Sequence, residues 1–135
     1  MQSSIFDILG PVMIGPSSSH TAGAEKIGKV ARVIADGSIK KAIFYLHGSF
    51  AKTYKGHGTD KALVAGILGM EADDERIKES LALAENMGIS VEFIEADLGD
   101  VHPNTVKIVI MKTDGTEISV IGSSVGGGEI VVIKI

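Results

Sequence analysis

The chain has 135 residues, of which 44% are hydrophobic and 22% are charged. This balance excludes disorder caused by low hydrophobicity, and the length fits a single domain over residues 1–135. A net charge of −4 and an aromatic content of 4% argue against nucleic-acid binding, which needs a basic surface or stacking aromatics. The chain has no cysteine, so it cannot supply thiolate ligands to zinc or to an iron–sulfur cluster.

No apolar run in the sequence approaches the ~20 residues needed to span a bilayer. Apolar residues are frequent in segment 5–14, but Asp7 interrupts them and no basic residue precedes them. We therefore expect no signal peptide, no membrane partner and a cytoplasmic location.

The first half of the chain is predicted to be mainly helical. Apolar residues three and four apart predict a helix over residues 19–36, followed by a short buried strand over 42–46. A polar, Gly-rich loop is expected over 48–58, and a second helix follows it. Asp73 is expected to cap a third helix that ends at Gly88.

Strands are predicted to dominate the second half, beginning with residues 89–93. The segments 105–112 and 117–122 predict a hairpin around Asp114-Gly115, where both turn residues are expected to have positive φ. A last strand over 129–135 follows three glycines, which indicate a bulge or bend. Together these elements predict an α+β fold, with one mixed β-sheet and helices packed on one of its faces.

Polar residues at the start of the first predicted helix form one candidate site. They are Ser17, Ser18, Ser19, His20 and Thr21, directly after Gly15-Pro16. Free N–H groups and the positive end of the helix dipole, together with hydroxyls and an imidazole, suit a carboxylate or phosphate. The alternative is a polar loop whose serines only cap the helix, and the two interpretations weigh about equally.

A second segment has a similar design. His57 lies between two glycines, and Gly58, Thr59 and Asp60 then lead into the second helix. An imidazole in such a loop can exchange protons near neutral pH, although a solvated loop with a surface histidine is the simpler alternative. His47, at a strand end, and His102, in a turn, are expected to be structural.

Two other patterns are dismissed. Segment 23–29 has the spacing of a phosphate-binding loop, but Val30 replaces the required Ser or Thr and the segment falls inside a helix. The acidic residues around Asp73 are expected to lie on a solvated helix start. The sequence therefore predicts no nucleotide site and no metal site within this chain.

Four segments together resemble the β chain of the bacterial iron–sulfur-dependent L-serine dehydratase. They are residues 15–21, 54–60, 102–105 and 126–128, and with their order and spacing the resemblance covers essentially the whole chain. A related domain occurs as a serine-associated regulatory module in some phosphoglycerate dehydrogenases.

The resemblance implies an L-serine ammonia-lyase that converts L-serine to pyruvate and ammonia. It also implies a partner α subunit that carries a cysteine-bound 4Fe-4S cluster, without which this chain would be inactive. The implied catalytic residues are His20 and His57. The implied substrate-binding residues are Ser17, Ser18, Ser19, Thr21, Gly58, Thr59 and Asp60.

The resemblance leaves the regulation of this chain and its exact role open. Two-subunit members commonly carry a C-terminal regulatory domain of the ACT type, which we expect to be missing or removed here. The alternatives to a catalytic subunit are a serine-sensing regulatory module and a subunit that only stabilises its partner.

Overall fold

The computed structural model describes residues 19–53, 58–71, 73–126 and 129–134. Its elements in chain order are α2 (Ser19–Ala35), β1 (Ile39–Gly48), α3 (Ser49–Thr53), α4 (Thr59–Ile67), the 3₁₀ helix η1 (Glu75–Glu79), α5 (Ser80–Asn86), β2 (Ser90–Glu95), β3 (Asn104–Lys112), β4 (Glu117–Gly126) and β5 (Glu129–Lys134). Among these helices, none is long and apolar enough to cross a membrane.

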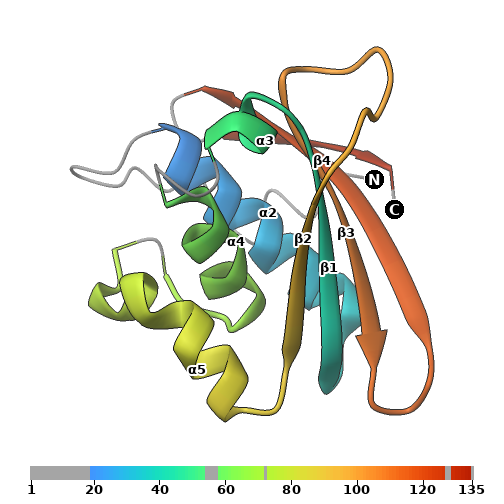
Figure 1. The fold of residues 1–135 in the computed structure, drawn as a ribbon. Helices are drawn as coiled ribbons and strands as arrows, with labels where there is room; N and C mark the ends of the chain where they lie inside the picture. Colours follow the sequence, from blue (N-terminus) through green and yellow to red (C-terminus); the bar gives the residue numbers. More distant parts are fainter. Residues whose placement is uncertain (1–18, 54–57, 72, 127–128, 135) are drawn as a thin grey trace.

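The five strands form one sheet in the order β2-β1-β3-β4-β5. β2 runs parallel to β1, and the other neighbouring strands are antiparallel. The helices lie on one face of this sheet (Figure 1). The predicted α+β fold, with one mixed sheet and helices on one face, is confirmed.

The core lies between the sheet and α2. Alternate residues of β1 and β3 point toward the helices, and α2 contributes side chains at helical spacing. The fully buried members from these three elements are Ala42, Phe44, Leu46, Val106, Ile108, Ile110, Ala24, Ile27, Val30 and Ala31. On the opposite face of β1, Tyr45 and His47 are half-buried, so the expected burial on both faces holds only for the centre of the strand.

Two segments differ from the prediction. The expected loop after β1 contains the short helix α3, which Phe50 anchors because its side chain is completely buried in the core. The third helix begins as the 3₁₀ turn η1, and its cap is Asp74, whose side chain accepts a hydrogen bond from the Arg76 N–H at 2.8 Å. The burial of Phe50 explains the first difference. In the second, the helix begins one residue later than predicted, so the capping carboxylate is that of Asp74 and not that of Asp73.

The β3–β4 hairpin exists, but its turn is not the predicted one. Gly115 has a φ of 92°, whereas Asp36 is the only non-glycine residue with positive φ among those that the structure describes. The Lys112 N–H donates to the Thr116 carbonyl at 2.9 Å, and the Gly115 N–H donates to the Lys112 carbonyl at 3.1 Å. Only the glycine therefore adopts the left-handed conformation, as in three-residue hairpin loops.

Helices α2 and α4 lie side by side and run in the same direction. A Cβ atom on Gly28 of α2 would collide with the Leu63 carbonyl oxygen, and one on Gly66 of α4 would collide with the Glu25 carbonyl oxygen. Farther along the pair, the Arg32 guanidinium donates to the Ile67 carbonyl at 3.3 Å. The two glycines therefore let the helix backbones touch, which larger residues would prevent.

We expect Gly66→Ala to lower the free energy of unfolding by about 1–3 kcal/mol, because the new methyl group overpacks the helix interface. Replacing glycine with alanine within a helix normally stabilises it by about 0.5–1 kcal/mol, so the sign of the effect is diagnostic. Urea unfolding of the two proteins measures it, and a stabilised Gly66→Ala variant would contradict the close approach.

Candidate functional site at the paired helix starts

The starts of α2 and α4 meet at one end of the domain. Because the two helices run parallel, their N-termini point the same way (Figure 1). A Cβ atom placed on Gly58 would lie 3.8 Å from Cγ2 of Thr21. The structure therefore brings together Thr21 and Gly58, the described ends of the two polar segments that the sequence singled out, although they are more than thirty residues apart.

Each helix start leaves positive backbone charge at this end. Gly58 caps α4 in the left-handed conformation, with φ 79°, and makes no side-chain capping hydrogen bond, whereas the first turn of α4 contains the carboxylate of Asp60. The first turn of α2 contains no acidic residue that would offset the dipole. The N–H groups in the first turn of a helix lack intrahelical partners, so the start of α2 suits an anion. At the start of α4, Asp60 already accepts one of these N–H groups and partly offsets the dipole.

Thr59 supplies a hydroxyl that the described residues leave without a hydrogen bond. Its side chain is completely buried, and Oγ1 has no hydrogen-bond partner in the part of the chain that the structure describes. A buried polar group without a partner costs about 1–3 kcal/mol, so such groups are rare and point to a role outside the fold. Thr59 is the first residue of α4, where a bound anion would meet the helix.

Asp60 places a carboxylate at the same helix start. Its Oδ1 accepts a hydrogen bond from the Lys61 N–H at 2.7 Å. Burial raises the pKa of Asp60, and the hydrogen bond from the Lys61 N–H opposes that effect. The carboxylate is therefore held facing the backbone of its own helix, in a partly desolvated position.

The remaining predicted site residues are described only in part. Ser19 and His20 form the first residues of α2, and the description of these two is limited to their backbone. Ser17, Ser18 and His57 lie outside the described residues. Their roles stay predictions.

His47 and His102 act as structural acceptors. The Leu98 N–H donates to His47 Nδ1 at 3.0 Å, and the Asn104 N–H donates to His102 Nδ1 at 3.0 Å. A nitrogen that accepts a hydrogen bond carries no proton, so the 3.9 Å approach of Asp97 to His47 is no ion pair in that state. The structural roles predicted for both histidines agree with these contacts.

No group of three or more His, Cys, Asp or Glu side chains within the described ranges could hold a metal ion.

Glu25 is a buried charge that the sequence analysis missed. Its exposed fraction is 2%, and its Oε2 lies 3.3 Å from Lys29 Nζ, which also contacts Glu71 Oε1 at 3.1 Å. Burial raises the pKa of Glu25 to about 7, although Lys29 partly opposes the shift. Glu25 lies four residues after Thr21 and three before Gly28, so the three residues share one face of α2. This spacing is the sequence signal that places Glu25 in the helix interface.

Glu25 makes the stability of the domain depend on pH. Its folded pKa of about 7 lies above the ordinary value of 4.5, so the proton favours the folded state. The stabilisation is complete below about pH 4.5 and is lost as the pH rises through about 7. We expect Glu25→Gln to be more stable than the wild type at pH 9, by up to about 3 kcal/mol, and to show little difference at pH 4.

Urea unfolding at several pH values measures this effect. Glu79→Gln is the matched control, because it removes the same charge from an exposed side chain. A Glu25→Gln variant with the same pH dependence as the wild type would contradict the assignment.

The unused hydroxyl of Thr59 gives a second stability prediction. Thr59→Val should change the free energy of unfolding by less than about 0.5 kcal/mol or raise it, because no hydrogen bond is lost. Thr105→Val is the matched control. Thr105 is equally buried, but its Oγ1 donates to the His102 carbonyl at 2.6 Å and lies 2.7 Å from Ser123 Oγ.

The control should lose about 1–3 kcal/mol, because the variant leaves buried polar groups without their partner. Thermal or urea unfolding compares the two variants, and equal losses would mean that the Thr59 hydroxyl has a structural partner after all.

Comparison with known proteins places the chain in a family. The family model described as "Serine dehydratase beta chain" matches residues 4–90. The chain is 55% identical to "L-serine dehydratase, beta chain" of Peptoniphilus asaccharolyticus, over 98% of this chain and 60% of that protein. It is 52% identical to "Probable L-serine dehydratase, beta chain" of Bacillus subtilis (strain 168), over the same shares.

A longer relative is "L-serine dehydratase 2" of Escherichia coli (strain K12). It is 31% identical over 95% of this chain, which corresponds to 33% of that protein. The chain thus spans 60% of the length of the two β-chain relatives. With a family match over residues 4–90, the chain belongs to the serine dehydratase beta chain family.

Proposed function

We propose that this chain is the β subunit of an L-serine dehydratase, which converts L-serine to pyruvate and ammonia in a site shared with an α subunit. The observation that carries the proposal is the pair of helix starts around the buried, unused hydroxyl of Thr59. The names of the relatives support the choice of L-serine as substrate and of an α subunit as partner.

The paired helix starts suit the carboxylate of an amino acid. N–H groups in the first turns of α2 and α4 would donate to its oxygens, and both helix dipoles favour the negative charge. The hydroxyls of Thr21 and Thr59 would add donors from the same end of the domain. The partly desolvated carboxylate of Asp60 would offer a negative charge to the substrate ammonium group.

His20 and His57 are the proposed proton-handling residues. The elimination requires removal of the α-proton and protonation of the departing hydroxyl, both within reach of an imidazole near neutral pH. His20 directly precedes Thr21, and His57 directly precedes Gly58, so each adjoins a residue of the paired helix starts.

The 4Fe-4S cluster of the proposed enzyme would be held by the α subunit. This chain has no cysteine and so offers the cluster no thiolate. Such a cluster, when bound, supplies a Lewis acid for the departing hydroxyl group. The part left to this chain is to hold the substrate carboxylate, to exclude water and to move protons.

Kinetics of the assembled enzyme test the proposal. We expect His20→Ala and His57→Ala, each coexpressed with the α subunit, to lower kcat/KM by at least roughly 100-fold, the lower range for acid–base groups. Thr59→Val should act mainly on KM, because its hydroxyl is proposed to contact the substrate carboxylate.

His47→Ala is the matched control, because its ring bonds only to the backbone of a nearby loop in the described contacts. It should lower stability more than turnover. Wild-type kinetics in both the His20 and His57 variants, with intact assembly, would remove the catalytic assignment, and a lost response to serine alone would indicate a sensor.

A further inference from the structure

The two edges of the sheet differ in how open they are to pairing. β5 pairs with β4 with register irregularities between Ser124 and Gly126 and between Ile121 and Gly122. β2 keeps an unbroken register with β1 and contains no proline. Among the described strands, β1 is the only one that pairs with β2. Bulges protect an edge from further pairing, so β2 is the less protected edge.

The backbone of β2 presents hydrogen-bonding groups to the outside. The Ala96 N–H donates to the Leu46 carbonyl of β1 at 2.9 Å. Backbone groups alternate in direction along a strand, so those of Glu92 and Ile94 point toward β1 as well. Those of Val91 and Glu95 consequently point away from β1, toward the outer edge.

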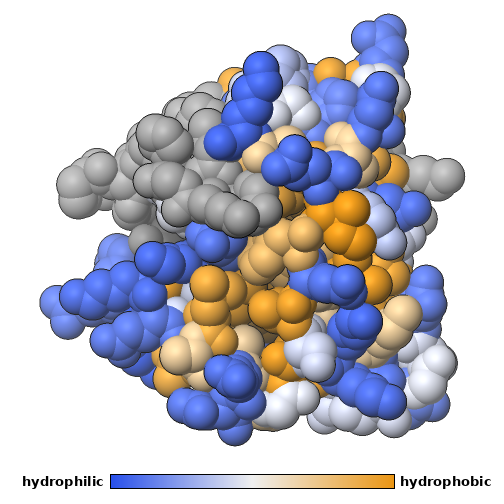
Figure 2. All heavy atoms as spheres, viewed as in Figure 1, coloured by the Kyte–Doolittle hydropathy of each residue, from blue (hydrophilic) through white to orange (hydrophobic). Residues whose placement is uncertain are grey.

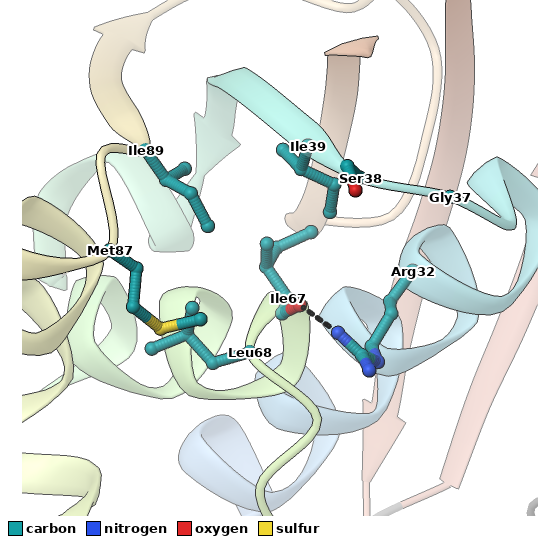
Figure 3. A pocket seen from close by; sticks show the side chains of 8 residues that line it. All are labelled: Arg32, Gly37, Ser38, Ile39, Ile67, Leu68, Met87 and Ile89. Atoms are coloured by element: carbon teal, nitrogen blue, oxygen red, sulfur yellow. Dashed lines mark hydrogen bonds between the residues drawn. The ribbon is translucent and has the colours of Figure 1, made fainter. Parts of the chain in front are cut away.

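A groove with a mixed polar and apolar lining lies between α5 and the start of β2. A cavity of about 410 Å³ is lined by Leu81, Glu85, Gly88, Ile89, Ser90 and Val91. Ile89 also lines a second cavity of about 490 Å³, together with Met87, Leu68 and Ile39 (Figure 3). Figure 2 shows the apolar surface gathered between α5 and β2. The short helix α5 thus leaves part of the adjoining apolar surface open.

The chain segment that contains α5 and β2 is strongly acidic. Residues 71–100 contain ten Asp or Glu and two Arg or Lys, a net charge of −8, whereas the rest of the chain carries +4. Glu85, Glu92 and Glu95 are exposed on α5 and β2, and Glu92 Oε1 lies 3.2 Å from Lys41 Nζ of β1. Val91 lines the groove, so Glu92 lies on the opposite face of the strand.

We propose that the β2 edge binds an extended segment of another protein in which apolar and basic side chains alternate. The segment adds a strand beside β2, its backbone pairing with the outward groups of Val91 and Glu95. Its apolar side chains enter the groove against Leu81. Its basic side chains lie beside Glu92, in place of the Lys41 ammonium group, whose exposed ion pair with Glu92 is weak. A second copy of this chain is a poor occupant, because pairing two β2 edges would bring together two segments of −8.

Binding of a designed peptide to the 135-residue chain tests this proposal. The probe is a fluorescein-labelled, end-blocked hexapeptide of alternating valine and lysine, followed by anisotropy. We expect saturable binding, and at least about tenfold weaker binding of the alternating valine–glutamate peptide. A valine–lysine peptide that is N-methylated at alternate residues should also lose at least about tenfold, because it cannot pair with a strand edge.

Charge-reversal variants locate the site. Glu92→Lys/Glu95→Lys should weaken binding of the valine–lysine peptide by at least about tenfold. Glu117→Lys/Glu129→Lys, which makes the same charge change at exposed positions of β4 and β5, should bind like the wild type. Circular dichroism and thermal unfolding establish that both double variants are folded.

Hydrogen exchange supplies the second readout. The peptide should protect the amides of Val91 and Glu95. No binding, equal binding to both double variants, protection confined to the starts of α2 and α4, or dimers that exclude the peptide would each overturn the proposal. The experiment contains neither serine nor the α subunit, so its failure leaves the proposed function unaffected.

Discussion

The contact between α2 and α4 through Gly28 and Gly66 is the constraint on which the site depends. Without a Cβ atom at either position, the helix backbones come into direct contact. That approach sets the axial register of the two helices, and the register puts Thr21 beside Gly58. Helices separated by ordinary side chains would lie 8–10 Å apart at their axes, as a rough rule, and could not bring their first turns together as closely.

Glycines also allow α2 to pack closely against the sheet. A Cβ atom on Gly23 would collide with the Ser124 side chain of β4, and one on Gly122 would lie 3.1 Å from Cγ2 of Ile27. The helix is thus held between β4 on one side and α4 on the other. The close contact has a cost, because it buries the carboxyl group of Glu25, whose charge Lys29 and Lys26 balance only in part. The geometry of the site and the pH sensitivity of the domain therefore have the same origin.

The domain presents two surfaces with opposite electrostatic character. The starts of α2 and α4 combine backbone N–H groups with hydroxyls, which attract anions. The β2 edge combines acidic side chains with a partly apolar groove, which attracts cationic and apolar groups. Since the helix starts and the β2 edge are built from different residues, a small ligand and a protein segment could be held at the same time without sharing a contact.

The sequence by itself determined the elements and the fold class. Apolar spacing predicted α2, α4 and the strands, because both periods are local properties of the chain. The polar segments around Thr21 and Gly58 were also identified there, since helix starts have a recognisable composition. Local signals could not show α3, because the burial of Phe50 in the core overrides a loop-like sequence.

Only the tertiary structure decided that the two polar segments meet. Their meeting depends on the relative position of α2 and α4 along their axes, which Gly28 and Gly66 set from within the helices. In the sequence a helical glycine indicates only a weaker helix, because its effect depends on what lies against it. The unused hydroxyl of Thr59 and the burial of Glu25 became visible for the same reason: both are properties of neighbours that are distant in the chain.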